Sequence, residues 1–166
     1  MFKIITTAIF LTLCSCGFKP MYKETPYNNL SNKTSQISIS PVKVFDGAYG
    51  IELRNNLMNK LTPLGKPENP NYILDITLSN PNIVDYTIKN DGTASSYLVI
   101  MNANYQLKQK KDFKVLLERT VNAEVSYNIL KNQFSTEMLK SNAIKLVIEN
   151  LANQIYFSII TYFTEK

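Results

Sequence analysis

Histidine and tryptophan are both absent from this sequence of 166 residues, and cysteine occurs only twice. Without an imidazole there is no Ser–His–Asp triad, no Cys–His pair and no histidine-ligated metal centre. The commonest general acid or base is missing as well. The five glycines form no Walker loop, no GxSxG and no GxGxxG motif. We therefore expect a protein that is not an enzyme, with no catalytic residues, no metal site and no cofactor.

Charged residues are few, at 19% of the chain, but lysine and arginine outnumber aspartate and glutamate by 18 to 13. The resulting net charge of +5 leaves an anionic partner open, whether nucleic acid, lipid headgroups or an acidic surface. Hydrophobic residues make up 45% of the chain, as is usual in globular proteins, and this length fits one domain.

Residues 1–15 have the features of a lipoprotein signal peptide. A short positive segment ending at Lys3 precedes an apolar run over residues 4–13 that only threonine interrupts. This run is too short for a membrane-spanning helix, which needs about 20 residues, but it fits the core of a signal peptide. Two small residues then precede Cys16, as bacterial lipoprotein processing requires, whereas Leu13 disfavours cleavage before Cys14. We predict that Cys16 is the acylated start of the mature chain; an uncleaved anchor and a plain signal peptide are the alternatives.

Acylation of Cys16 by palmitate or similar fatty acids would attach the protein stably to a membrane, because several buried acyl chains suffice where one does not. This covalent lipid is the only non-protein group that we expect. The residue after Cys16 is Gly17, whereas an inner-membrane lipoprotein often has aspartate there. This difference favours sorting of the protein to the outer membrane. Nucleic acid is an implausible partner for such an exported protein. Residues 16–35 are polar and contain two prolines, so they form the lipidated N-terminus and a tether.

Hydrophobic periodicity predicts one domain over residues 36–166. We expect an edge strand interrupted at Pro41, a strand that breaks near Pro81 and then resumes, two further strands, and two helices. The expected ranges are 36–44, 72–78 with 83–88, 97–108 and 115–127 for the strands, and 46–62 and 135 to near the end for the helices. This order predicts an α+β two-layer sandwich: a four-stranded, mostly antiparallel sheet with two helices packed on one face and a polar opposite face.

Lysines gather at two turns of the predicted sheet. Lys89 precedes an Asn-Asp-Gly turn, and Lys108, Lys110, Lys111 and Lys114 surround the next turn. Because the strand between the turns is antiparallel to its neighbours, the two groups should lie at opposite ends of it and form no single patch. The second group either keeps the sheet edge soluble or binds the phosphates of lipid headgroups.

The segment that begins at Cys16, Cys-Gly-Phe-Lys-Pro-Met-Tyr, resembles the opening of the lipopolysaccharide-assembly lipoprotein family LptE, and of its alphaproteobacterial members in particular. The resemblance continues through the Asn90–Gly92 turn, residues 97–103 and 126–128, and Leu151–Ile155 in the last helix. It implies a sandwich of two helices and four strands, in agreement with the pattern of the strands and helices.

The resemblance also implies a role. Members of this family sit as a plug inside the outer-membrane β-barrel LptD, on the periplasmic side, and help to assemble it and to deliver lipopolysaccharide to the cell surface. They bind lipopolysaccharide through basic residues, and Lys89 matches one such position. A second position falls near Ser135 and Thr136, which are not basic, so Lys131 is the nearest substitute. An auxiliary or pilot lipoprotein of another envelope transport or secretion complex is the alternative, and a hydrolase using serine with lysine or aspartate is a minor one.

Overall fold

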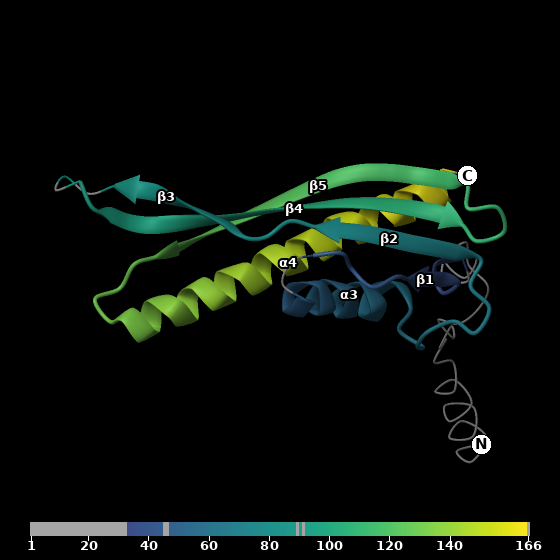
Figure 1. Ribbon diagram of the computed structural model, residues 1–166, viewed down its shortest axis with the longest axis horizontal. Coiled ribbons are helices and arrows are strands. Elements are labelled where there is room, and N and C mark those ends of the chain that lie inside the picture. Colours follow the sequence, from purple (N-terminus) through teal and green to yellow (C-terminus); the bar gives the residue numbers. More distant parts are fainter. Residues whose placement is uncertain (1–32, 45–46, 89, 91, 166) are drawn as a thin grey trace, which may run out of the picture.

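The computed structural model describes residues 33–44, 47–88, 90 and 92–165. Their elements are β1 (Ile37–Ile39), α3 (Gly47–Leu61), β2 (Tyr72–Leu78), β3 (Asn82–Ile88), β4 (Ala94–Gln109), β5 (Val115–Asn128) and α4 (Gln133–Thr164). Figure 1 shows the sheet as one layer, with both helices on the same side of it. The predicted α+β fold class, with two helices on one face of a mostly antiparallel sheet, is confirmed.

Strand β4 is the centre of the sheet. It pairs with β5 from Ser96 to Lys108, so β2 and β3 must share its other edge, end to end. All three neighbours run antiparallel to β4, whereas β1 is parallel to β2. The five strands therefore occupy four positions across the sheet. The expected break lies at residues 79–81, where the Ser79 hydroxyl accepts a hydrogen bond from the Asn102 amide at 2.8 Å.

The edge strand is interrupted at Pro41, as predicted. The Ser40 amide still donates to the Leu74 carbonyl at 3.0 Å, and pairing resumes when the Lys43 amide donates to the Ile76 carbonyl at 2.9 Å. Proline has no amide hydrogen, so it cannot continue the ladder between these two points.

The helices bury one apolar stripe each. In α4 the stripe includes Ile144, Ile148, Leu151, Ile155 and Ile159, which lie in the core between helix and sheet. The helix begins slightly earlier than expected, because the Asn132 side chain accepts hydrogen bonds from the Phe134 and Ser135 amides and so forms the N-cap.

The apolar stripe of α3 ends with the helix itself. Leu53, Leu57 and Leu61 are buried, but Leu64, which continues their spacing, is 97% exposed. The helix stops at Leu61, and a turn closed by the Gly65 amide and the Thr62 carbonyl follows it, so position 64 no longer faces the sheet. Asp46, with which the predicted helix range begins, lies outside the described residues.

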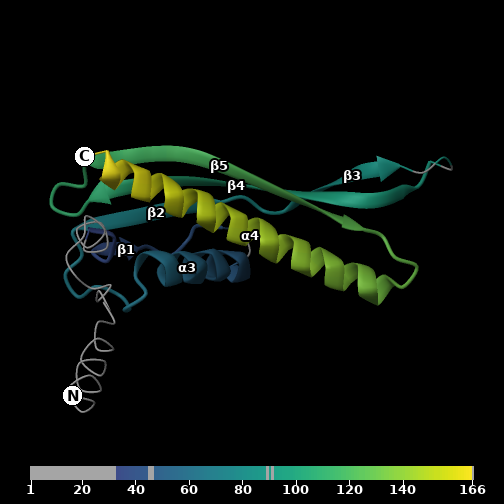
Figure 2. The ribbon, with the colours of Figure 1, turned by 180° about the vertical axis from the view of Figure 1, so that it is seen from behind.

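The sheet extends beyond the helices at one end. In Figures 1 and 2, α4 diverges from the sheet where β3 pairs with the beginning of β4. Val84 lies opposite Leu98, on the side of the sheet away from the helices, and two register shifts follow it in β3. Val84, Tyr86 and Ile88 are all exposed, although their apolar alternation is typical of a covered face. No helix among the residues described here is long and apolar enough to cross a membrane.

Candidate functional site

The face of the sheet that points away from the helices is the candidate site, and we call it the outer face. Tyr105 and Leu107 of β4 are buried against the helices, so the alternating residues between and beside them point the other way. The register joins these residues into polar cross-strand rows: Asp75, Gln106 and Glu118 in one, and Thr77, Asn104 and Thr120 in the next.

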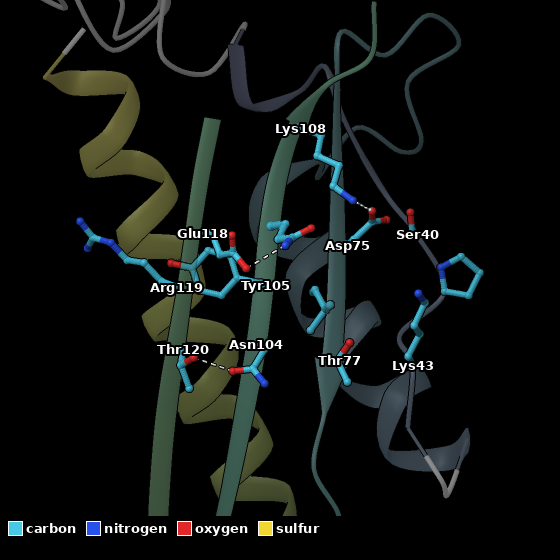
Figure 3. Close-up of a pocket in the computed structure, with 13 residues that line it drawn as sticks. Ser40, Lys43, Asp75, Thr77, Asn104, Tyr105, Lys108, Glu118, Arg119 and Thr120 are labelled. Carbon is cyan, nitrogen blue, oxygen red and sulfur yellow. Dashed lines mark hydrogen bonds and ion pairs between the residues drawn. The ribbon is translucent and has the colours of Figure 1, made fainter. Parts of the chain in front are cut away.

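Hydrogen bonds link the side chains along these rows (Figure 3). The Gln106 amide donates to the Glu118 carboxylate at 2.8 Å, and the Thr120 hydroxyl donates to the Asn104 side-chain oxygen at 2.5 Å. The ordered arrangement holds polar groups across three strands in fixed positions. Such a surface can exchange hydrogen bonds with a polar partner without first ordering its own side chains.

An ion pair lies at the edge of the outer face. The Lys108 ammonium group is 2.8 Å from the Asp75 carboxylate, whose side chain is 37% exposed. The hydrogen bond from Lys108 is the largest influence lowering the pKa of Asp75, and a hydrogen bond from Ser40 and the charge of Lys43 act in the same direction. Burial of the carboxylate acts to raise the pKa, but the net result is a lowered pKa.

These residues border a shallow cavity of about 240 Å³ between Ser40–Lys43 and the three strands (Figure 3). A serine, two lysines and an aspartate are thus close together, as a serine hydrolase with lysine or aspartate would require. However, Asp75 has a lowered pKa and is engaged by Lys108 and Ser40, which makes it a poor proton acceptor. These contacts are better suited to keep the side chains of the outer face in place than to activate a serine nucleophile.

Lys131 is the one predicted lipopolysaccharide-binding residue that the structure describes; Cys16 and Lys89 lie outside the described residues. Lys131 is exposed in the connection between β5 and α4, directly before the cap residue Asn132. Figure 1 places this connection at the same end of the molecule as the turn between β3 and β4. The turn between β4 and β5, which carries Lys110, Lys111 and Lys114, lies at the other end of the molecule.

The pairing of Asp75 with Lys108 was not predicted from the sequence, which indicated only that this face of the sheet is polar. The two residues are 33 positions apart, and their contact depends on the register of β2 against β4. Arg119 is a charged residue on the side of β5 that faces the helices. It pairs with buried Tyr105 and donates a hydrogen bond to the Ser158 hydroxyl of α4 at 3.4 Å.

A potential metal site would need several ligating side chains together. In the part of the chain that the structure describes, no three histidine, cysteine, aspartate or glutamate residues lie close enough to hold a metal ion.

Comparison with known proteins identifies a family. Residues 35–159, about three quarters of the chain, match the model of the family described as LptE, lipopolysaccharide-assembly. No curated protein matches the chain.

Solved structures with this fold include three named as lipoproteins. A candidate lipoprotein of Caulobacter crescentus has a TM-score of 0.66 at 14% identity, covering 84% of this chain and 98% of that one. A minor lipoprotein of Acinetobacter baumannii has a TM-score of 0.56 at 22% identity, covering 76% and 94%. Rare lipoprotein B of Shewanella oneidensis has a TM-score of 0.54 at 11% identity, covering 77% and 98%. At these identities the likeness establishes the fold alone.

The ion pair on the outer face predicts a pH-dependent contribution to stability. Because the pKa of Asp75 is lowered on folding, the contribution is present at neutral pH and is lost as the pH falls below the ordinary value of 3.8. Lys108→Gln should raise the Asp75 pKa, measured by NMR of the carboxyl carbon. It should also lower the free energy of unfolding at neutral pH by no more than about 1 kcal/mol, since the pair is partly exposed.

The difference in the free energy of unfolding between Lys108→Gln and the unaltered protein should vanish at a pH where Asp75 is protonated in both proteins. Lys140→Gln is the matched control, because Lys140 pairs with Glu137 at 3.4 Å on the surface of α4, far along the chain from Asp75. An Asp75 pKa that stays the same in Lys108→Gln would contradict the assignment of Lys108 as the main cause.

Proposed function

Since this chain belongs to the LptE family of lipopolysaccharide-assembly proteins, we propose that it is an outer-membrane lipoprotein that plugs the β-barrel LptD and helps to assemble it. In this role it assists the transport of lipopolysaccharide to the cell surface. The family is one of lipoproteins without enzymatic activity or cofactor, so the protein acts through the surfaces that it presents to its partners.

The outer face is the observation that carries the proposal. The lumen of a large outer-membrane barrel is polar, so a plug needs a polar surface that can be desolvated at low cost. Thr77, Asn102 and Asn104 are exposed on this face, and its charges are partly neutralised within the Asp75–Lys108 pair. Such a face supports docking against polar side chains in the lumen better than against lipid tails.

Two further elements of the proposal concern lipid. Cys16 carries the acyl chains that hold the protein at the periplasmic side of the outer membrane. Lys89 and Lys131 contribute ammonium groups that contact the phosphates of lipopolysaccharide, and the exposure of Lys131 supports this role.

Changing Cys16 to Ser tests the anchor. The variant should lose all incorporation of radioactive palmitate, since a hydroxyl cannot replace the thiol as acyl acceptor in lipoprotein processing. It should also leave the membrane fraction when envelopes are washed. Cys14→Ser is the control and should label normally. Palmitate labelling that persists in Cys16→Ser would contradict the lipoprotein assignment.

A pull-down from detergent-solubilised envelopes tests the partner and the face together. The tagged full chain should recover a large outer-membrane β-barrel, identified by mass spectrometry. Thr77→Trp should lower this recovery about tenfold or more, because a bulky side chain in the middle of the outer face prevents close approach.

Tryptophan is well tolerated in strands, so Thr77→Trp should remain folded, as circular dichroism can verify. Glu149→Trp is the matched control on the exposed side of α4 and should recover the barrel normally. Recovery of an inner-membrane transporter in place of a barrel would support the alternative of an auxiliary lipoprotein. Equal recovery by Thr77→Trp would exclude the outer face from the interface.

Charge reversal tests the lipid-binding lysines. Lys89→Glu and Lys131→Glu should each weaken the binding of purified lipopolysaccharide by about fivefold or more, because each removes an ammonium group from an anionic ligand. Lys145→Glu, on the exposed side of α4, should bind as the unaltered protein does. Affinities can be compared by fluorescence titration. Unchanged affinity in both variants would move the lipid site elsewhere on the molecule.

A further inference from the structure

The turn between β4 and β5 has a composition that the proposed function does not use. We call residues 110–114, Lys-Lys-Asp-Phe-Lys, the basic turn, and all five of its residues are exposed. Lys110, Lys111 and Lys114 enter no ion pair with any residue that the structure describes, whereas nearby Lys108 is bound to Asp75. The single acidic residue, Asp112, leaves the turn with a net charge of +2.

Phe113 lies among these lysines and is 66% exposed. Its φ of 56° is in the left-handed region, which a residue other than glycine rarely adopts. The turn holds it there, because the Gln109 amide donates to the Lys114 carbonyl at 2.9 Å and the Lys114 amide donates to the Asp112 carboxylate at 3.2 Å. The chain therefore presents an aromatic side chain to solvent in a hydrogen-bonded turn that also carries three exposed lysines.

Backbone hydrogen bonds connect the basic turn to the start of the described chain. The Lys110 amide donates to the Asn71 carbonyl at 2.8 Å, the Asn71 amide to Gln36 at 3.0 Å, and the Gln36 amide to Lys33 at 3.3 Å. Seventeen positions separate Lys33 from Cys16, which can span at most about 60 Å. The basic turn thus lies at the end of the molecule to which the tether is joined.

The opposite end is much farther from this attachment point. Helix α4 alone, with 32 residues, is about 48 Å long, and it ends beside the start of the described chain, where the Lys33 ammonium lies 5.9 Å from the centre of the Phe163 ring. Its other end leads to the β5–α4 connection (Figures 1 and 2). The end with the basic turn is therefore the end at which the tether joins the described chain.

We propose that the basic turn rests on the anionic phospholipid headgroups of the membrane that holds acylated Cys16, with Phe113 inserted at the interface. This inference rests on the proposed lipidation. Lysine side chains neutralise headgroup phosphates, and an aromatic ring between them gains from entering the interface, so the turn supplies a second contact beside the anchor. Asp112 within the turn and Glu165, which caps the end of α4 at this end of the molecule, are acidic side chains that such a contact must keep away from the headgroups.

The absence of tryptophan from the chain makes a direct test available. Phe113→Trp in the full acylated protein places a single indole in the basic turn, and Phe134→Trp places one at an equally exposed site near the start of α4. In vesicles of phosphatidylcholine with phosphatidylglycerol, the emission of Phe113→Trp should shift to the blue and be quenched by brominated lipid. The emission of Phe134→Trp should stay as in water, as should that of Phe113→Trp in phosphatidylcholine alone.

Lysine variants in the Phe113→Trp background test the role of charge. Changing Lys110, Lys111 and Lys114 together to Gln should reduce occupancy of the anionic surface roughly a hundredfold, since each lysine contributes about fivefold. The matched triple change to Arg should keep the blue shift. No shift in Phe113→Trp, or an equal shift on vesicles without phosphatidylglycerol, would overturn the proposal, and so would a shift produced by lipopolysaccharide but not by phosphatidylglycerol.

Flotation of the same samples separates this inference from the proposed function. Protein that floats with the vesicles but shows no shift at position 113 has a working anchor and a basic turn that does not touch lipid. Protein that fails to float lacks the acyl chains, which would contradict the lipoprotein assignment itself and, with it, the basis of the inference.

Discussion

Coverage of the sheet on only one face is the constraint from which the other features follow. Strand β4 is paired along both edges, so its side chains alternate between the helices and the outer face over 16 residues. The row Val99, Met101, Ala103, Tyr105 and Leu107 is completely or almost completely buried. The alternate residues have no second layer above them, and they must therefore be polar or be covered by another molecule.

Much of the fold could be predicted because apolar periodicity determines which residues face the core. The interruption of the edge strand at Pro41 and the break near Pro81 were both recognisable, since proline cannot donate to a ladder. Which apolar residues the helices cover could not be predicted, because this depends on where each helix ends in space. Leu64 continues the apolar spacing of α3 but lies beyond its end, and Ile88 follows two register shifts in β3, so both are exposed. A register shift beside Lys108 likewise puts Val115 opposite that lysine instead of on the face of Leu117.

The candidate site was predictable as a polar face but not as a set of contacts. Alternation along β4 and β5 indicated which residues share the outer face. The bonds of Gln106 to Glu118 and of Lys108 to Asp75 depend on the register of strand pairs, which a single sequence does not specify at this separation. The roles of Cys16 and Lys89 came from local motifs and a family resemblance, and neither residue is among those that the structure describes.

The length of the sheet separates two kinds of surface that would interfere if they were close. The basic turn is proposed to contact anionic lipid, whereas a plug of the proposed kind must enter a polar lumen without carrying bound lipid along its docking face. Along β4 the basic turn follows Gln109, and the turn at Asn90 precedes Ala94, so the whole strand lies between them. At about 3.3 Å per residue this is roughly 50 Å, several times the distance over which salt screens an exposed charge. The lysines of the basic turn can thus attract a headgroup surface without changing the electrostatics around Lys131, and each end of the molecule can meet a different partner.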